Sequence, residues 1–267
     1  MRITIVTISF NQAQFLRQCI DSILTQTECD LEYIVVDPGS TDGSRELIES
    51  YGEQIIRVFE PDQGPADGLN KGFAIATGDV FGFINADDAL YPGALSKVTD
   101  TFNRQPSTEV VAGCGYKVDA EGKILERVIP TIWTPWLYLY GGVTIFQQGV
   151  FFRKNNFTLA GGFNINNKTC WDGELFLNFA LKKARLFILF DNLALFRVHE
   201  TSITGSGRLN TAYRLDQKRL FSQTVGHPPG KLTWILSICA RISKWIFNPR
   251  YVFIRLNQFV WQRTDIA

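Results

Sequence analysis

The first 108 residues alternate apolar, strand-like runs with segments of helical spacing, and this alternation restricts the chain to an α/β fold. Runs rich in β-branched residues predict strands at 3–8, 31–36, 55–59 and 80–84. The segments between them predict helices at 13–26, 43–51 and 66–76, with another after Pro92. Strands joined by single helices form βαβ units, so we expect a mostly parallel, Rossmann-like sheet flanked by helices.

The pattern is more varied after residue 108. Residues 109–118 and 123–129 flank the turn Asp119-Ala120-Glu121-Gly122, which predicts a hairpin. A further strand is expected at 147–153, a helix at 173–183, and one or two strands at 186–198.

Composition and charge exclude two classes of protein. Apolar residues make up 45% of the chain and charged residues 20%, which is ordinary for a globular protein and wrong for a disordered one. A net charge of +1 provides no general field for nucleic acid, so we expect no nucleic-acid partner. The charge is uneven, however: residues 208–267 hold 10 basic and 2 acidic residues, against 17 and 24 in residues 1–207. We therefore predict a main domain at 1–207 and a basic, helical C-terminal extension at 208–267.

The extension contains the pattern of an amphipathic helix at 231–247. Its apolar side carries Ile235, Ile238, Cys239, Ile242, Trp245 and Ile246. Ser237, Arg241 and Lys244 fall on the other side. A basic amphipathic helix bordered by Trp suits an anionic membrane surface. The alternative is a helix that packs on the main domain and leaves its basic face in water.

Aromatic side chains gather at 131–146, where they are suited to an acceptor sugar, a hydrophobic core or a membrane-facing patch. Five cysteines stand singly, with no CxxC pair, which argues against a disulfide framework and a zinc site. The first apolar run is too short for a signal peptide, and no stretch suits a membrane-spanning helix. These features favour a cytoplasmic protein, peripheral on the inner face of the plasma membrane if the extension binds lipid.

Polar clusters follow three of the predicted strands. Ser9 and Asn11 follow the first, Asp37 and its turn follow the second, and residues 85–88 follow the fourth. In open α/β sheets, ligands bind beyond the carboxyl ends of the strands. We therefore expect these three clusters to converge on one ligand site.

The cluster Asn85-Ala86-Asp87-Asp88 places two carboxylates side by side. Adjacent carboxylates repel each other unless a cation or hydrogen-bond donors lie between them. Oxygen ligands of this kind suit Mg²⁺ or Mn²⁺. The alternative is a turn whose aspartates cap the following helix.

The cluster at 37–43 divides between two roles. The carboxylate of Asp37 can accept hydrogen bonds from a ribose or a base, whereas Ser40, Thr41 and Asp42 are expected to cap the next helix. Asn11 is likewise expected to cap the helix at 13–26.

A further acidic cluster, Trp171-Asp172-Gly173-Glu174, opens a predicted helix. Asp172 can serve as a general base and Glu174 can orient a substrate hydroxyl, although acidic residues are also common at helix N-termini without any catalytic role. His199 lies just beyond a predicted strand and is either a functional ligand or a hydrogen-bonded structural residue. The chain has no GxGxxG after its first strand, no GxxxxGK[ST] and no GxSxG, which argues against a dinucleotide-binding Rossmann domain, a P-loop NTPase and an α/β-hydrolase.

The motif order over residues 3–112 resembles that of family 2 glycosyltransferases of the GT-A fold. The matching pieces are VTISFN at 6–11, VVDPGSTDGS at 35–44, DQGPADGLNKG at 62–72, ATGD at 76–79 and NADD at 85–88. The resemblance extends more loosely to residues 147–153 and 171–174, and it does not cover the last 60 residues.

The resemblance implies a GT-A type catalytic domain with an assigned site. Its nucleotide-binding positions are Thr7, Ser9, Asn11, Asp37, Asp67, Lys71, Asn85 and Ala86. Asp87 would bind a divalent metal, Mn²⁺ or Mg²⁺, with Asp88 and His199 as further ligands, and Asp172 would be the catalytic base. One departure is Asn85, which replaces the first aspartate of the family's DxD motif and adds no negative charge.

The implied function is an inverting, metal-dependent hexosyltransferase. It would move a sugar from a nucleotide-sugar, with a UDP-sugar favoured, to a saccharide or lipid-linked saccharide in surface polysaccharide synthesis. A nucleotidyltransferase is disfavoured because no Gly-rich, basic loop follows the first strand. A non-catalytic carbohydrate- or membrane-binding protein on a degenerate transferase scaffold is the remaining alternative, which Asn85 leaves open.

Overall fold

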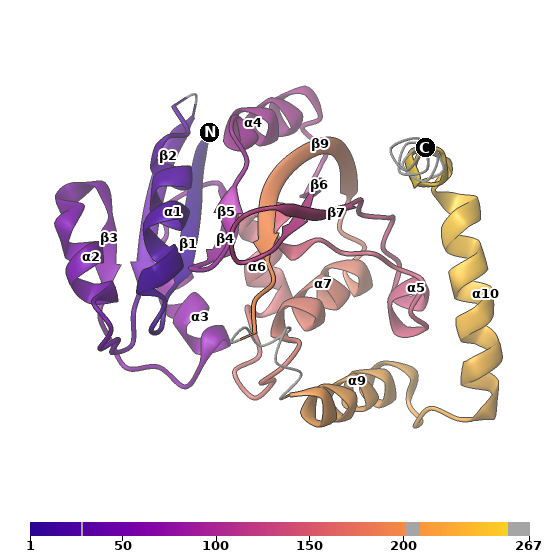
Figure 1. Cartoon of the computed structure of the whole chain (residues 1–267). Helices are drawn as coiled ribbons and strands as arrows, with labels where there is room; N and C mark the ends of the chain where they lie inside the picture. The colour runs from indigo at the N-terminus through magenta and orange to yellow at the C-terminus, as the bar shows by residue number, and fades with distance from the viewer. Residues whose placement is uncertain (28, 201–208, 256–267) are drawn as a thin grey trace, which may run out of the picture.

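The computed structural model describes residues 1–27, 29–200 and 209–255. A single sheet runs through the molecule in the order β3-β2-β1-β4-β8-β6-β9-β5, and β7 pairs with β6 (Figure 1). The strands are β1 (Arg2–Ile8), β2 (Asp30–Val36), β3 (Ile56–Val58), β4 (Val80–Asn85), β5 (Ala89–Leu90), β6 (Val110–Val118), β7 (Ile124–Val128), β8 (Val150–Arg153) and β9 (Leu186–Arg197).

Helices cover both faces of this sheet (Figure 1). They are α1 (Ala13–Leu24), α2 (Ser44–Ser50), α3 (Pro65–Ile75), α4 (Ala94–Arg104), α5 (Pro135–Leu139), α6 (Lys154–Ala160), α7 (Trp171–Leu181), α9 (Asn210–Val225) and α10 (Lys231–Phe247). The expected α/β class is confirmed.

The first half of the chain forms the expected parallel sheet. β1 lies between β2 and β4, and β2 pairs with β3, with all three pairs parallel. At the carboxyl end of β1, Ile8 is in register with Val36 on one side and Asn85 on the other. The residues that follow β1 and β2 therefore lie beside the end of β4, at one edge of the sheet.

The second half adds strands in both directions. β8 runs antiparallel to β4 and β6, β7 forms the expected hairpin with β6, and β9 runs parallel to β6. The short β5, which the sequence pattern did not predict, pairs antiparallel with β9 through Ala89 and Leu195. This pairing draws the end of β9 toward the turn that follows β4.

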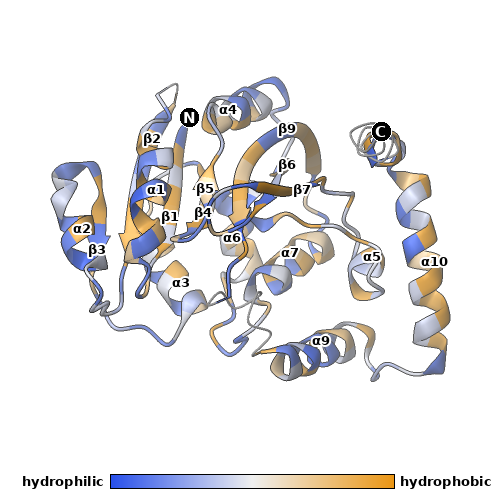
Figure 2. Cartoon of the chain, in the orientation of Figure 1, coloured by the Kyte–Doolittle hydropathy of each residue, from blue (hydrophilic) through white to orange (hydrophobic). Residues whose placement is uncertain are grey.

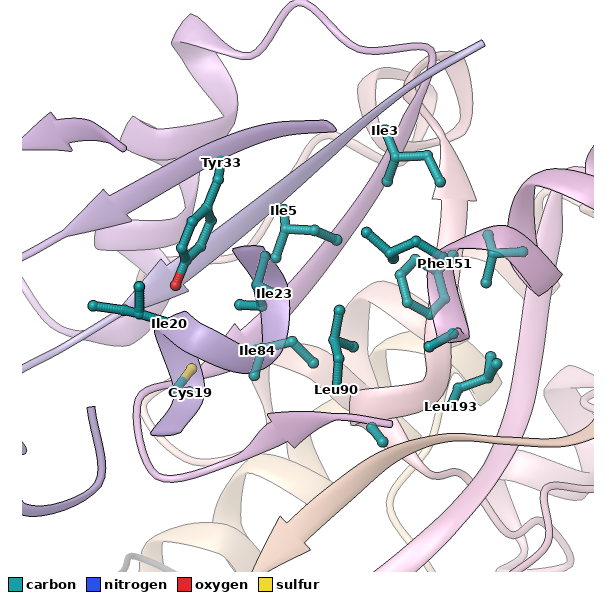
Figure 3. Close-up of a cluster of buried hydrophobic side chains, with 14 of the residues drawn as sticks. Ile3, Ile5, Cys19, Ile20, Ile23, Tyr33, Ile84, Leu90, Phe151 and Leu193 are labelled. Atoms are coloured by element: carbon teal, nitrogen blue, oxygen red, sulfur yellow. The ribbon is translucent and has the colours of Figure 1, made fainter. Parts of the chain in front are cut away.

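Two apolar layers hold the sheet between its helices. The layer beneath α1 and α4 includes Ile3, Ile5 and Ile20 (Figure 3). The opposite layer is built largely of phenylalanine rings and packs α3, α6 and α7 against the sheet. The apolar face of α1 is buried as its spacing predicts, because residues three and four apart share one side of a helix.

The expected N-cap of α1 is wrong. Gln12 is the cap residue, whereas Asn11 adopts a positive φ of 52° and bonds to the neighbouring turn. The cap of α2 is Gly43, with φ 95°, and not Ser40 or Thr41. A left-handed backbone conformation favours glycine and asparagine, and Gly43 and Asn11 are residues of these two types.

The C-terminal helices differ in how they meet the rest of the chain. α9 packs on α7 through Leu220, which joins a buried cluster with Cys170 and Leu177. α10 lies beside α5 along one side of the molecule (Figure 1). The predicted domain boundary at residue 207 lies outside the described residues. No helix in the described part of the chain is long and apolar enough to cross a bilayer.

Candidate functional site

The carboxyl edge of the parallel strands places Ser9, Asp37 and Ala86 side by side. The N–H of Ser9 donates to Val36 O at 2.9 Å, and the N–H of Asp37 donates to Val58 O at 3.0 Å. The N–H of Ala86 donates to Ile8 O at 3.2 Å. The ladder therefore continues one residue beyond each strand, and it fixes the backbone of this edge.

Asp37 is buried at this edge with one carboxylate oxygen engaged. Its Oδ1 accepts hydrogen bonds from the N–H groups of Gly39 and Ser40 at 2.9 and 2.8 Å and from Arg45 Nε at 3.1 Å. Its Oδ2 is buried and has no hydrogen-bond partner among the described residues, and the same is true of Ser9 Oγ. Buried polar atoms are nearly always paired, so two unpaired acceptors at one strand edge fit a hydrogen-bonding ligand.

The loops around Asp37 are joined by side-chain to backbone bonds. Ser40 Oγ accepts from the N–H of Asn11 at 2.8 Å, and Asn11 Oδ1 accepts from the N–H of Thr41 at 2.9 Å. Asp42 accepts from the N–H of Ala13 and from Ser44, at the starts of α1 and α2. The side chains of Asn11, Ser40 and Asp42 hold two helix starts together, which supports a structural role for Ser40 and Asp42.

Thr7 lies away from this edge. Its hydroxyl is fully buried, accepts from the Tyr33 hydroxyl at 3.1 Å and lies 3.9 Å from Cys19 Sγ. The structure therefore places the Thr7 side chain in the core beneath α1. A direct contact between this hydroxyl and a nucleotide has no support from its position.

Asp67 and Lys71 brace the loop before α3. Asp67 Oδ2 accepts from the N–H of Gln63 at 2.9 Å and lies 3.7 Å from Lys71 Nζ. Lys71 also donates to the carbonyl of Pro61. Both side chains remain partly exposed, so they fix the loop and leave polar atoms near its surface.

Asp87 and His199 meet in space. Asp87 Oδ2 lies 3.1 Å from His199 Nε2, and the pairing of β5 with β9 brings the two chain segments together. Adjacent ligands of an octahedral ion lie about 3.0 Å apart when each is about 2.1 Å from the metal. The pair therefore fits two neighbouring positions on a divalent ion. The described residues contain no cluster of three His, Cys, Asp or Glu side chains, so a metal here would rely on substrate oxygens and water for its other ligands.

Asp88 differs from its neighbour because its carboxylate is already used. Its Oδ1 accepts from the N–H of Arg197 at 2.9 Å, and its Oδ2 accepts from Gln148 Nε2 and Asn85 Nδ2 at 2.9 and 3.2 Å. Burial, with the nearby charge of Asp87, raises the pKa of Asp88 well above its ordinary value. Asp88 is therefore a buried anchor for three segments, and the geometry does not support its expected role as a metal ligand. Asn85 shares this anchor through its amide.

Asp172 lies in the first turn of α7, where its Oδ1 accepts from the N–H of Gly173 at 2.8 Å. Burial raises the pKa of Asp172 above its ordinary value. The side chain lines a pocket of about 580 Å³ between α5, α7 and α9. Trp171 packs on Phe83 of β4 with ring centroids 5.6 Å apart, so this pocket adjoins the strand that leads to Asp87.

Glu174 does not face the pocket as a free carboxylate. Arg219 Nη2 donates to its Oε2 at 2.7 Å, and Asn164 and Asn167 donate to it at 2.9 and 2.6 Å. Burial opposes the charged form, but these bonds outweigh it and lower the pKa of Glu174. Its oxygens hold the 164–167 loop and α9 in place, and a role in orienting a substrate hydroxyl stays a prediction.

A family model described as glycosyl transferase family 2 matches residues 4–171, which is more than half of the chain. The chain belongs to glycosyltransferase family 2. The region matched includes the strand edge with Asp37 and Asp87 and stops one residue before Asp172.

Relatives in sequence carry glycosyltransferase names. An uncharacterized glycosyltransferase of Nostoc sp. is 37% identical over 123 residues, which cover 45% of this chain and 37% of that protein. One of Rickettsia typhi is 27% identical over 216 residues, covering 76% of this chain and 66% of that protein. A PGL/p-HBAD biosynthesis glycosyltransferase of Mycobacterium bovis is 28% identical, covering 64% and 66%. The chain thus spans between 37% and 66% of the length of these relatives.

Solved structures share the fold at low sequence identity. TarS 1–349 of S. aureus in complex with UDP-GlcNAc has a TM-score of 0.68 and 17% identity, over 93% of this chain and 72% of that one. The mannosyltransferase PcManGT of Pyrobaculum calidifontis, in complex with GDP-Man and Mn²⁺, has a TM-score of 0.63 and 16% identity, over 97% and 79%. These likenesses confirm the GT-A type fold.

Arg197 is a residue of this glycosyltransferase that the sequence analysis missed. It is 3% exposed and lies two positions before His199. Its Nε donates to Asp87 O at 3.0 Å, and its Nη1 donates to the carbonyls of Asp119 and Ala120 at 3.1 and 2.8 Å. Arginine is rarely fully buried unless it is paired, so an arginine within a predicted strand is a sequence signal for a specific partner. The sequence does not identify that partner, because Asp87, Asp119 and Ala120 lie far from Arg197 along the chain.

The aromatic segment at 131–146 divides among the expected roles. Trp133 and Phe146 are buried in the core, whereas Trp136 is exposed. Tyr138 lines the pocket beside Asp172, and Tyr140 packs edge-on against Phe221 of α9 at 5.4 Å. Only part of this segment therefore borders a candidate ligand site.

Proposed function

We propose that this family 2 protein is an inverting glycosyltransferase that transfers a sugar from a nucleotide-sugar to a hydroxyl of a saccharide or lipid-linked saccharide in surface polysaccharide synthesis. The observation that carries the proposal is the placement of three carboxylates. Asp37 lies at the carboxyl edge of the parallel strands, Asp87 pairs with His199 beyond β4, and Asp172 borders a pocket whose lining residue Gln147 donates to Phe83 O of β4 at 3.0 Å. A protein that only binds sugars has no need of all three.

The donor would be held by the strand edge. Asp37 Oδ2 and Ser9 Oγ are the buried acceptors that a base N–H or a ribose hydroxyl would satisfy. TarS was solved with UDP-GlcNAc and PcManGT with GDP-Man, which supports a nucleotide-sugar as donor. We favour a UDP-sugar.

Asp87 and His199 would hold a divalent ion, Mn²⁺ or Mg²⁺, together with oxygens of the donor diphosphate. When bound, such an ion neutralises charge on the diphosphate leaving group. Arg197 would position this pair because its Nε donates to Asp87 O, and Asp88 because its Oδ1 accepts from the N–H of Arg197. Asn85 contributes its amide to Asp88, so the loss of a negative charge at this position leaves the anchor intact.

Asp172 would act as the general base. As the acceptor oxygen attacks the anomeric carbon, the acceptor proton passes to the Asp172 carboxylate. The new C–O bond forms as the bond from the anomeric carbon to the diphosphate breaks, and the diphosphate leaves with the electron pair. Attack opposite the leaving group inverts the anomeric centre, and no protein nucleophile is required.

Helix α10 supports attachment to an anionic membrane surface. The residue that it buries is Ala240, and its apolar side is exposed: Ile235, Ile238, Cys239, Ile242, Trp245 and Ile246. Hydrophobic residues recur along the length of α10 (Figure 2). In the alternative, in which α10 packs on the main domain, this apolar side would be buried and the basic side would be exposed. Exposed Arg241 and Lys231 border this apolar side, and no carboxylate occurs from 217 to 255. An apolar face of this size in water, with only positive charges beside it, fits an acidic lipid surface.

A thermal shift experiment tests the proposal. UDP, GDP, dTDP and CMP are each added with and without Mn²⁺ to the wild type and to Asp87→Ala. A ligand at about 100 times its Kd adds about 2.7 kcal/mol to the free energy of unfolding, a rise of several degrees in Tm. We expect one nucleotide to stabilise the wild type only with metal. If none stabilises, and no transfer occurs, the non-catalytic binding protein is the better description.

A further inference from the structure

The pocket beside Asp172 is built in part by the C-terminal region. Tyr138 of α5 and Gly173 of α7 form one side, and Asn210, Tyr213 and Gln217 of α9 form the other. The family match ends at residue 171, so α9 lies outside it. The wall opposite the proposed base therefore comes from a part of the chain that the family model does not match.

Helix α9 is fixed in this position by paired charges and hydrogen bonds. Arg219 donates to Glu174 at 2.7 Å, and Thr169 Oγ1 donates to Asp216 Oδ2 at 2.7 Å. Glu174 lies two residues after Asp172 on α7, so one ion pair ties α9 to the helix that carries the base. The wall is a built surface, and its side chains are held near Asp172.

The lining is polar but almost uncharged. Among the described lining residues, Asp172 is the charged side chain. The other polar groups are the hydroxyls of Tyr138, Tyr213 and Thr169, the thiol of Cys170 and the amides of Gln147, Gln217 and Asn210. Arg219 is nearby but is neutralised by Glu174. An anionic group placed in this pocket would meet the carboxylate of Asp172 without a compensating cation, and like charges disfavour each other at short range.

Tyr213 offers a flat surface inside the pocket. Tyr213 lines the cavity and is 47% exposed, so its side chain is accessible to a ligand. Burial raises the pKa of Tyr213 and of Tyr138, so both hydroxyls stay protonated and can donate. An aromatic ring with a polar tip suits a sugar, which has apolar C–H faces and a rim of hydroxyl groups.

We propose that this pocket binds an uncharged sugar residue at the end of the acceptor, and that Tyr213 of α9 is one of its binding residues. The inference rests on the proposed transferase function and names the acceptor class for the same site. A phosphate of a lipid carrier would then lie outside the pocket, at least one sugar away from the reacting hydroxyl.

Two acceptor probes of opposite charge test the ligand class. Octyl glucoside, octyl galactoside and octyl N-acetylglucosaminide are compared with octyl glucuronide for binding to the UDP- and Mn²⁺-loaded protein by saturation-transfer NMR. We expect at least one neutral glycoside to bind and the glucuronide to give no signal. Binding of the glucuronide alone, or of no neutral glycoside, overturns the proposal.

The variant Tyr213→Ala tests the residue, with Tyr213→Phe to separate the ring from its hydroxyl. Leu215→Ala is the matched control, since Leu215 is 65% exposed on α9 and does not line the pocket. We expect Tyr213→Ala to weaken binding of the neutral glycoside about tenfold or more, while Tyr213→Phe loses less and Leu215→Ala is unchanged. An equal affinity for Tyr213→Ala and the wild type contradicts the assignment.

A separate readout distinguishes failure of this inference from failure of the proposed function. Stabilisation by UDP with Mn²⁺ and slow hydrolysis of the donor depend on Asp37, Asp87 and Asp172 and need no acceptor. If both persist while no neutral glycoside binds, the acceptor assignment is wrong and the transferase function stands. If both are absent in the wild type, the proposed function is wrong.

Discussion

Asp87 Oδ2 and His199 Nε2 lie 3.1 Å apart although 112 positions separate the two residues. The two-residue strand β5 explains the contact, because it begins just after Asp88 and pairs with the end of β9. Both side chains are largely buried, with 17% and 6% of their surface exposed. The contact gives a specific expectation for metal binding.

Asp87→Ala and His199→Ala should each abolish the stabilisation that Mn²⁺ adds in the presence of UDP. A divalent ion with only one remaining protein ligand would depend on the diphosphate and water for all its other ligands. Differential scanning fluorimetry with and without EDTA measures the effect. Asp100→Ala, at an exposed position on α4, is the control and should respond to Mn²⁺ as the wild type does. An undiminished metal response in both variants would remove this pair as the metal site.

Asp172→Asn should keep nucleotide binding and lose transfer. The amide cannot take the acceptor proton, and loss of a general base typically lowers the rate by about 10² to 10⁴. The measurements are UDP affinity by calorimetry and transfer by release of UDP. Glu121→Gln, on the exposed hairpin turn, controls for loss of a carboxylate. Normal turnover by Asp172→Asn would show that another group is the base.

The raised pKa of Asp172 also predicts the pH dependence of stability. A carboxyl group whose pKa is higher in the folded state destabilises that state once it is ionised. Asp172→Asn should therefore be more stable than the wild type at neutral pH. The gain should shrink as pH falls through the raised pKa and vanish below the ordinary Asp value of 3.8. Urea unfolding at several pH values measures it, and a gain that grows toward acid pH would be the opposite sign.

Arg219→Met should destabilise the protein, because it leaves the buried carboxylate of Glu174 with only its asparagine partners. Removing one partner of a buried polar group costs about 1–3 kcal/mol. The lowered pKa of Glu174 means that the pair stabilises the fold above the unfolded pKa, and that this contribution is lost as pH falls through the folded pKa. Arg104→Met, at an exposed pair on α4, should change the free energy of unfolding little.

Trp234→Ser combined with Ile246→Ser should abolish binding to vesicles that contain an anionic lipid. The two side chains are 70% and 69% exposed on α10, and their transfer from water into lipid would supply much of the attraction. Flotation with phosphatidylglycerol vesicles measures binding, and pure phosphatidylcholine vesicles test the charge dependence. Leu159→Ser, on α6 with 69% exposure, is the matched control. Retained binding by the double variant would place lipid contact elsewhere, as would equal loss in the control.

The sequence was sufficient to predict the elements that depend on local sequence pattern. β-branched runs located β1, β2 and β4, and the parallel rule then placed Asp37 beside the end of β4. It was insufficient where a partner lies far along the chain. Asp88 and Asp87 are neighbours of the same type, and only the distant Arg197 and Gln148 make one an anchor and leave the other for a ligand.

The same limit applies to Glu174 and to Asn11. Glu174 follows the proposed base by two residues, but Arg219, 45 positions away, decides that its oxygens are used. Asn11 has the composition of a helix cap, but the turn at 40–41 draws its side chain away from α1. Residue type shows which hydrogen bonds and charges a side chain can offer, and tertiary packing determines which partner it binds.

Arg197 binds the turn of the β6–β7 hairpin through the main-chain carbonyls of Asp119 and Ala120. Because these two contacts are to backbone oxygens, they place no demand on the side chains of Asp119 and Ala120. The hairpin can therefore vary Ala120 and Glu121 during evolution or in a redesigned enzyme, provided that Gly122, with its φ of 88°, and the Asp119 carboxylate that accepts from the N–H of Lys123 keep the backbone path. The support of the Asp87 edge would then be inherited unchanged by variants that differ in the loop above it.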